Sequence, residues 1–260
     1  MRRDCMAVNH LAIGRACFVV RAGSLPNGYN QRPGMTLLLA DGEPLELEID
    51  GQSVVSADAW LLAPEIRRRF VRPQPHVSIT VEPSHPAYAR LLRWARLSPN
   101  AAHRFEVTTT DRARLAEAAT QQTFDAWLDG LLAHNQQPSA AANPRLEHLL
   151  ALVQEADIET SAEQIWQSFR LRYPSTQAHC SHWLQECIGI PLRKLLLWQK
   201  LRRALEALSG AHGATEVAHA AGFADSAHLS RICLRTFGLR PSQANVHKIL
   251  QVNRFPDYWH

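Results

Sequence analysis

The sequence has little that would support a metal-dependent or disulfide-stabilised protein. Its five cysteines are odd in number and form no C-x-x-C pair, so they indicate neither a disulfide framework nor a four-thiolate zinc site. No H-x-H pair occurs either. The hydrophobic runs are short: Met35–Ala40 falls far short of the ~20 residues that a membrane span requires. We therefore expect reduced thiols, no metal or cofactor, and a soluble cytoplasmic protein.

The positive charge is concentrated in the C-terminal part of the chain. At 260 residues the length suits two domains, and the net charge is +4. Residues 1–140 hold 15 arginines and 14 acidic residues, whereas residues 164–260 hold 12 Lys or Arg against 5 acidic residues, a net charge of +7. A concentration of positive charge of this kind favours binding to the phosphate backbone of a nucleic acid.

Residues 35–81 have the pattern of a small β domain. Short apolar or alternating runs are separated by turn residues, and Asp41-Gly42 and Asp50-Gly51 are hairpin dipeptides. In residues 44–50, Leu and Ile alternate with acidic residues, as in a strand with one buried face. The regular spacing predicts a small sandwich or barrel.

Helical patterns follow in residues 86–97 and 111–133. These helices either pair with a second subunit or cover the open end of the barrel, and the sequence leaves both interpretations open. Residues 136–143 are polar and bounded by proline, which is typical of an interdomain linker.

Residues 215–242 read as a helix-turn-helix. Gly222 is placed to end the first helix in a left-handed conformation, and Asp225 is placed to cap the second by accepting the amide near His228. The inward stripe of the second helix consists of Leu229, Ile232, Cys233 and Phe237. The opposite face carries Ser226, Ala227, His228, Arg231 and Arg235, before Gly238 and Pro241 end the helix. Such a face can enter a DNA major groove.

This segment resembles the second helix-turn-helix of the AraC/XylS family of bacterial transcription regulators. The family pattern A-x-x-x-G-F-x-D-x-S/A-H-F/L-x-R-x-F-K-R-x-F-G-x-x-P is matched by Ala218, Gly222, Phe223, Asp225, Ala227, His228, Leu229, Arg231, Arg235, Phe237, Gly238 and Pro241. Cys233 and Leu234 stand where the family prefers Phe and Lys.

The resemblance implies a sequence-specific DNA-binding transcription regulator and not an enzyme. It implies an α+β architecture: a cupin-like β-barrel with flanking helices in residues 1–135, a linker in 136–143, a DNA-binding domain in 144–245 and a tail in 246–260. Two helix-turn-helix motifs would be joined by a long helix that opens at Gly189-Ile190-Pro191. The expected partners are double-stranded DNA, RNA polymerase, a second copy of the chain, and an effector. That effector is a small molecule or, alternatively, a regulatory protein. A repair enzyme with an appended DNA reader is disfavoured by the cysteine count and spacing.

The first helix-turn-helix is less regular. Residues 163–171 should form its leading helix and 176–188 its recognition helix, with Ser175 as the cap. Its turn lacks the glycine of the family and carries Pro174. The face expected toward the groove consists of Ala178, His179, Ser181 and His182. We do not interpret the two histidines as metal ligands, because Cys180 points away from them and no fourth ligand is evident.

Individual roles follow from side-chain chemistry. Arg231 is the best candidate for reading a base, because a guanidinium can engage O6 and N7 of guanine together. The residues expected on phosphates are Arg193, Lys194, Arg202 and Arg203, and Arg235 is expected to act in the same way. The residues expected at an effector pocket are Arg21, Tyr29, Trp60, Arg67 and His76. The competing interpretation makes the consecutive residues Arg67, Arg68 and Arg69 a solvated turn and Trp60 part of the core.

Overall fold

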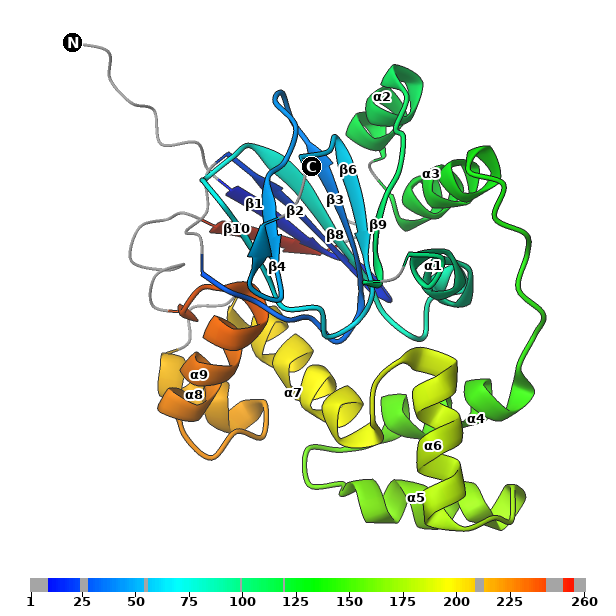
Figure 1. The fold of residues 1–260 in the computed structure, drawn as a ribbon. Coiled ribbons are helices and arrows are strands. Elements are labelled where there is room, and N and C mark those ends of the chain that lie inside the picture. Colours follow the sequence, from blue (N-terminus) through cyan, green and yellow to red (C-terminus); the bar gives the residue numbers. More distant parts are fainter. Residues whose placement is uncertain are drawn as a thin grey trace.

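The computed structural model describes residues 9–23, 28–53, 56–98, 100–118, 120–208, 213–241 and 250–254 (Figure 1). Its larger sheet has the strand order β10-β1-β2-β8-β3-β6-β9. These strands are β1 (Asn9–Ile13), β2 (Cys17–Ala22), β3 (Met35–Ala40), β6 (Ala59–Leu62), β8 (His76–Val81), β9 (Ala102–Arg104) and β10 (Leu250–Arg254). The smaller sheet has the order β5-β4-β7, with β4 (Leu47–Ile49), β5 (Gln52–Ser53) and β7 (Arg68–Phe70).

Three helices cover one face of the larger sheet. They are α1 (Tyr88–Ala95), α2 (Thr109–Glu117) and α3 (Gln121–His134). Strand alternation turns Leu37, Leu39 and Ile79 toward these helices, where they join Leu91 and Leu128 in one core. The structure thus places the helices of the N-terminal half on a face of the open sheet, and not at the open end of a barrel as one alternative expected; pairing with a second subunit stays a prediction. The predicted helical stretch 111–133 is divided between α2 and α3, because Thr120 caps a new helix.

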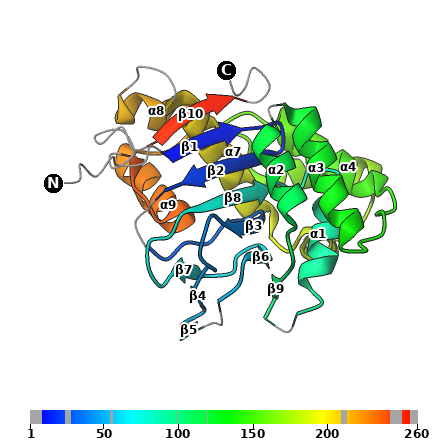
Figure 2. The same cartoon turned by 90° about the horizontal axis from the view of Figure 1, so that it is seen from above.

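The opposite face of the larger sheet is shared by two partners (Figure 2). Leu38, Trp60 and Leu62 pack against the smaller sheet. Leu11 and Phe18, on β1 and β2, instead pack against helices from the C-terminal half. Within the described residues the larger sheet has edges at β10 and β9, so the expected cupin-like barrel is an open sandwich.

One of the two hairpin predictions is confirmed and the other is wrong. Asp50 and Gly51, with φ of +50° and +82°, join β4 to β5 as a two-residue turn. The Asp41-Gly42 turn instead leads from β3 into the smaller sheet, and β3 pairs with β6 and β8. Strands β1, β2, β7, β9 and β10 had no counterpart in the prediction.

The C-terminal half is helical. Its helices are α4 (Pro144–Glu155), α5 (Ala162–Arg172), α6 (Gln177–Ile188), α7 (Leu192–Leu208), α8 (Ala214–Ala220) and α9 (Ser226–Phe237). α4 begins at Pro144, with the Asn143 side chain accepting the amide of Leu146. The long α7 connects the α5–α6 pair to the α8–α9 pair (Figure 1). In the ranges that the structure describes, no helix combines the length and hydrophobicity needed to cross a membrane.

Candidate nucleic-acid interface

The turn between α8 and α9 is fixed by three local features. Gly222 has φ +80°, which an L side chain adopts only with strain. The Asp225 carboxylate accepts the His228 amide at 2.6 Å, and this hydrogen bond holds the pKa of Asp225 below its usual value. Gly238, with φ +75°, ends α9. The predicted turn, cap and end of this motif are therefore confirmed.

The recognition helix α9 separates an apolar face from a polar one. Leu229 and Cys233 are buried, and burial raises the pKa of the Cys233 thiol to about 12. Ala227, Arg231 and Arg235 are exposed, while Ser226 and His228 are half-buried. The His228 ring lies edge-on to Phe223 at 5.4 Å between centroids, which fixes its position at the start of α9.

The first motif has the same layout with a different cap. Ser161 and Gln164 form a capping box at the start of α5. The N-cap of α6 is Thr176, whose hydroxyl accepts the His179 amide at 3.2 Å, so the expected Ser175 cap is wrong by one residue. The exposed or half-buried residues of α6 include the predicted groove-facing set, Ala178, His179, Ser181 and His182.

Aromatic stacking holds the first motif together. The Phe169 ring of α5 stacks on the Trp183 ring of α6 at 5.6 Å. The Arg145 guanidinium of α4 lies over Trp183, 4.1 Å from the ring centroid. A cation over an indole ring is attracted by its negative face. Arg145 was missed by the sequence reasoning, because its partner lies 38 residues away in another helix.

Of the four α7 residues expected on phosphates, two form ion pairs with the N-terminal half in the described part of the chain, and two do not. Arg193 is exposed, and Arg203 donates to the carbonyl of Ala156 at 2.5 Å. Lys194 forms an ion pair with Glu65, and Arg202 forms one with Glu82 at 2.5 Å. Burial raises the pKa of Glu82, and the charge of Arg202 opposes that shift. The structure therefore places Lys194 and Arg202 at the contact between the two halves, each paired with a carboxylate of the N-terminal half.

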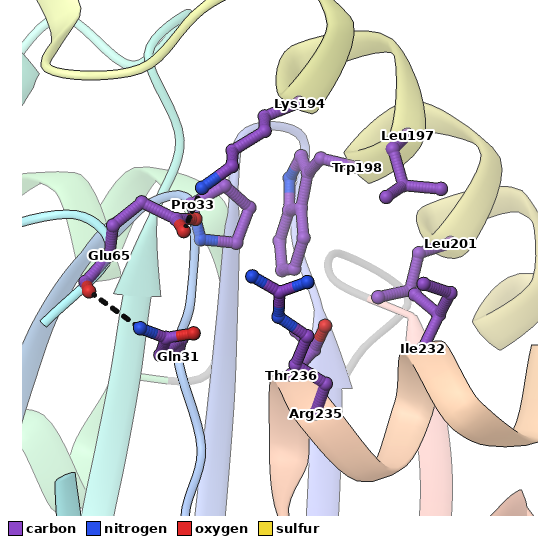
Figure 3. Close-up of a pocket in the computed structure, with 10 residues that line it drawn as sticks. All are labelled: Gln31, Pro33, Glu65, Lys194, Leu197, Trp198, Leu201, Ile232, Arg235 and Thr236. Carbon is purple, nitrogen blue, oxygen red and sulfur yellow. Dashed lines mark hydrogen bonds and ion pairs between the residues drawn. The ribbon is translucent and has the colours of Figure 1, made fainter. Parts of the chain in front are cut away.

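The C-terminal end of α9 also lies against the N-terminal half (Figure 3). The backbone N–H of Gln31 donates to the backbone carbonyl of Arg235 at 2.9 Å. The Arg32 guanidinium lies 5.6 Å from the Phe237 ring centroid. The backbones of Gly28 and Gly238 approach so closely that a Cβ on either would lie 2.9 Å from the other's carbonyl oxygen. Beside this contact, α7, α9, Gln31 and neighbouring residues line a small cavity of about 60 Å³.

The predicted effector residues do not form one site. Trp60 and His76 are buried on the inner face of the larger sheet. Arg21 donates to the carbonyl of Leu115 on the opposite, helix-covered face. Tyr29 hydrogen-bonds Glu48 on the outer face of the smaller sheet, and Arg67 stacks on its ring at 3.9 Å.

The interior of the sandwich holds two arginines that the prediction did not assign to it. Arg32 donates to the hydroxyls of Ser78 and Thr80, both at 2.8 Å, and Arg68 donates to Thr36 at 3.1 Å. Burial lowers the pKa of Arg32 to about 10, and burial together with Arg32 lowers that of Arg68 well below its usual value.

No ion pair within the described ranges involves either guanidinium, and Nε of Arg32 has no hydrogen-bond partner there. A buried charge ordinarily has a counter-charge. The charge of Glu65 opposes the shift in the pKa of Arg68 but does not cancel it, so the interior of the sandwich holds two buried guanidinium groups whose charge is only partly offset.

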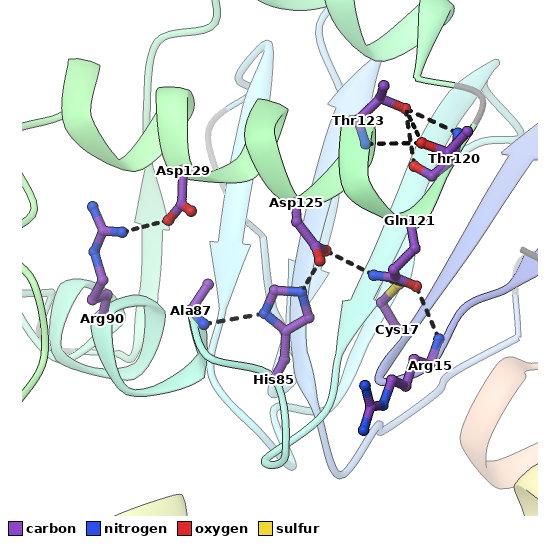
Figure 4. Close-up of polar contacts among 10 residues, drawn as sticks. All are labelled: Arg15, Cys17, His85, Ala87, Arg90, Thr120, Gln121, Thr123, Asp125 and Asp129. Atoms are coloured by element: carbon purple, nitrogen blue, oxygen red, sulfur yellow. Dashed lines mark hydrogen bonds and ion pairs between the residues drawn. The ribbon is translucent and has the colours of Figure 1, made fainter. Parts of the chain in front are cut away.

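A polar network beneath α3 combines cysteine, histidine and aspartate (Figure 4). The His85 ring contacts Asp125 at 3.1 Å, and Gln121 links Asp125 to the amide of Arg15. Cys17 contacts Gln121, and burial raises its thiol pKa to about 12. A protonated thiol is a poor nucleophile, so this network ties α3 to the sheet and supplies no reactive thiolate.

Comparison with known proteins assigns the C-terminal region. Residues 174–245 match the sequence profile of a family described as a helix-turn-helix domain. This region is a helix-turn-helix domain of the AraC type. No curated protein matched the chain.

The fold of the whole chain is similar to that of ToxT from Vibrio cholerae, an AraC family regulator. A ligand-free ToxT variant superposes with a TM-score of 0.61 at 12% identity, covering 89% of this chain and 97% of that one. ToxT bound to (E)-4-(8-methylnaphthalen-1-yl)but-3-enoic acid superposes with a TM-score of 0.60 at 14% identity, covering 90% of this chain and 100% of that one. ToxT bound to an unsaturated fatty acid superposes with a TM-score of 0.57 at 12% identity, covering 88% of this chain and 92% of that one. These matches confirm the predicted order of an N-terminal β-sheet domain followed by helix-turn-helix motifs.

Proposed function

We propose that this protein is a sequence-specific transcription regulator that inserts α6 and α9 into successive major grooves on one face of DNA. The observation that carries the proposal is the second helix-turn-helix, whose capped recognition helix presents the exposed Arg231 beside a buried apolar stripe. Helices joined through a rigid connector such as α7 suit two groove contacts about one helical turn apart.

Roles follow from exposure and chemistry. Arg231 reads a guanine, and Ser226, Ala227 and His228 read neighbouring positions. In the first motif, Ala178, His179, Ser181 and His182 face the groove. Arg193, Arg203 and Arg235 serve phosphates. Lys194 and Arg202 would join them only after leaving Glu65 and Glu82.

Binding titrations against specific and random duplexes test this assignment. Arg231→Ala should lower specific affinity by ~1–3 kcal/mol and relax preference at one base pair. Arg193→Ala should weaken binding to all sequences and reduce the slope of log affinity against log salt by about one. Arg104→Ala removes an exposed charge on β9 and serves as the control for net charge. Unchanged sequence preference in the Arg231→Ala protein would remove Arg231 from base reading.

We further propose that the effector is a small organic acid held between the two sheets. Arg32 and Arg68 supply buried positive charge without an acidic partner in an ion pair, and Trp60 and Leu62 supply apolar surface on the same inner face. The carboxylate would accept from the guanidinium groups, and the apolar part would lie along the sheet. The two acids named for ToxT support this class of ligand. Arg32 also touches Phe237, so the ligand would reach the end of α9.

Thermal unfolding in the presence of fatty acids and shorter organic acids tests the effector. Binding to the folded state should raise the melting temperature with ligand concentration. Arg32→Gln should abolish that rise, whereas Arg21→Gln, on the opposite face, should leave it unchanged. If acids leave the melting temperature fixed and a copurifying protein alters DNA binding, control by a protein partner replaces control by a metabolite.

A further inference from the structure

The chain returns to the N-terminal sheet after its second helix-turn-helix. β10 pairs in parallel with β1 over five positions, from Asn9 opposite Leu250 to Ile13 opposite Arg254. Figure 2 shows β10 at the edge of the larger sheet, next to β1. The segment that follows α9 in sequence is thereby attached to the half of the molecule that precedes the DNA-binding region.

The same strand β1 also supports the second motif through its side chains. Leu11 and Ile13 belong to one core with Trp198 and Leu201 of α7 and with Leu229 of α9. β1 is therefore held by α7 and α9 on its inner face and by β10 at its edge. Pairing with β10 and docking of the second motif both involve this strand, so they should favour each other.

In this docked arrangement, two of the side chains expected on phosphates are paired with carboxylates of the N-terminal half. Lys194 pairs with Glu65, and Arg202 pairs with Glu82 and donates to the carbonyl of Gly14. The Arg235 carbonyl accepts the Gln31 amide, and Arg235 lines a cavity together with Glu65. DNA approaching the C-terminal end of α9 would meet this loop, and the charge of Lys194 beside it is already balanced by Glu65.

We infer that residues 250–254 are an autoinhibitory strap that holds the second helix-turn-helix in a docked state of lower DNA affinity. The inference rests on the proposed DNA binding. A strand added at a sheet edge is held chiefly by backbone pairing, so it can detach while the sheet stays folded. When β10 detaches, the second motif is free to move away from β1. Lys194 and Arg202 can then leave their carboxylate partners and bind phosphates. The strap thus lowers the fraction of molecules competent to bind.

Two truncations test the strap. A chain ending at residue 249 lacks β10, and a chain ending at Arg254 keeps it and serves as the matched control. The shorter chain should bind specific DNA about fivefold or more tightly than the control, at the lower end of ordinary allosteric coupling. Hydrogen exchange of the backbone amides in residues 9–13 should be faster in the shorter chain, because the β1 edge is open.

A reversible lock tests the same inference without removing any residue. His10 and Gln251 are directly paired, so a disulfide in the His10→Cys/Gln251→Cys protein joins positions at a suitable separation. Oxidation should lower DNA affinity about fivefold or more, and reduction should restore it. The His10→Cys single variant controls for effects of the thiol and of the oxidant on the native cysteines.

The outcomes separate the strap from the proposed function. Tighter binding on truncation, together with weaker binding on locking, supports the strap. Faster exchange in residues 9–13 with unchanged or weaker DNA binding overturns it, as does unchanged exchange, which would mean that β10 does not pair. Failure of every form to bind any DNA contradicts the proposed function itself.

Discussion

Acidification should destabilise the protein through His76, which lies inside the sandwich. His76 is 4% exposed, and its Nδ1 lies 2.7 Å from the Gln74 carbonyl, to which the neutral ring donates. Burial is the main reason that its pKa falls from 6.5 to about 4, and the charge of Arg32 lowers it further. Between these two values the unfolded chain binds a proton that the folded protein does not. Stability is therefore present above pH 6.5 and is lost as the pH falls from 6.5 toward 4.

The size of the loss follows from the two pKa values. A shift of this size corresponds to about 3 kcal/mol over the full window, and to roughly 2 kcal/mol between pH 7 and pH 5. Urea unfolding of the wild type and of His76→Gln at several pH values measures it. The difference in unfolding free energy between the two proteins should shift by that amount in favour of the variant as the pH falls. His85→Gln, at a second histidine that is buried in the described residues, should leave the His76 contribution in place. A pH-independent difference between wild type and His76→Gln would mean that His76 does not change its protonation on unfolding.

Three further predictions concern the second motif and its support. Gly222→Ala should lower the unfolding free energy by ~1–2 kcal/mol, because φ is +80° and the new Cβ would lie 3.0 Å from the Ile158 Cβ; equal melting temperatures would contradict the strained turn. Asp225→Ala should lower the melting temperature and Asp225→Asn should lower it less, since asparagine also caps helices; equal decreases would argue against the capping role. A fragment of residues 141–260 should bind DNA, with a second motif less protected from hydrogen exchange than in the full chain, because β1 and β2 no longer cover α7; equal protection would contradict that support.

The second helix-turn-helix could be predicted in detail because its determinants are local. Gly222, Asp225 and Gly238 each act on backbone within three or four residues, so sequence spacing alone specifies the turn, the cap and the end. The same reasoning found the Asp50-Gly51 hairpin. It failed at Asp41-Gly42, because whether a turn joins neighbouring strands depends on which sheet the next strand enters.

Contacts between distant segments could not be predicted. The helical spacing puts Arg202 on the solvent-exposed face of α7, which suggests a phosphate-binding residue. Its ion-pair partner Glu82 lies 120 residues away, so nothing in the sequence indicates the pair. Three consecutive arginines suggested either a pocket mouth or a solvated turn. Strand alternation in β7 instead buries Arg68 and leaves Arg67 and Arg69 exposed. That strand is only three residues long, which is too short for its alternation to be recognised in the sequence.

The decisive measurement is the selection of bound sites from random DNA by the full chain. We expect an enriched site with two short elements about one helical turn apart, and loss of preference at one base pair when the selection is repeated with Arg231→Ala. Enrichment of no sequence, or of an identical site by both proteins, would contradict this expectation.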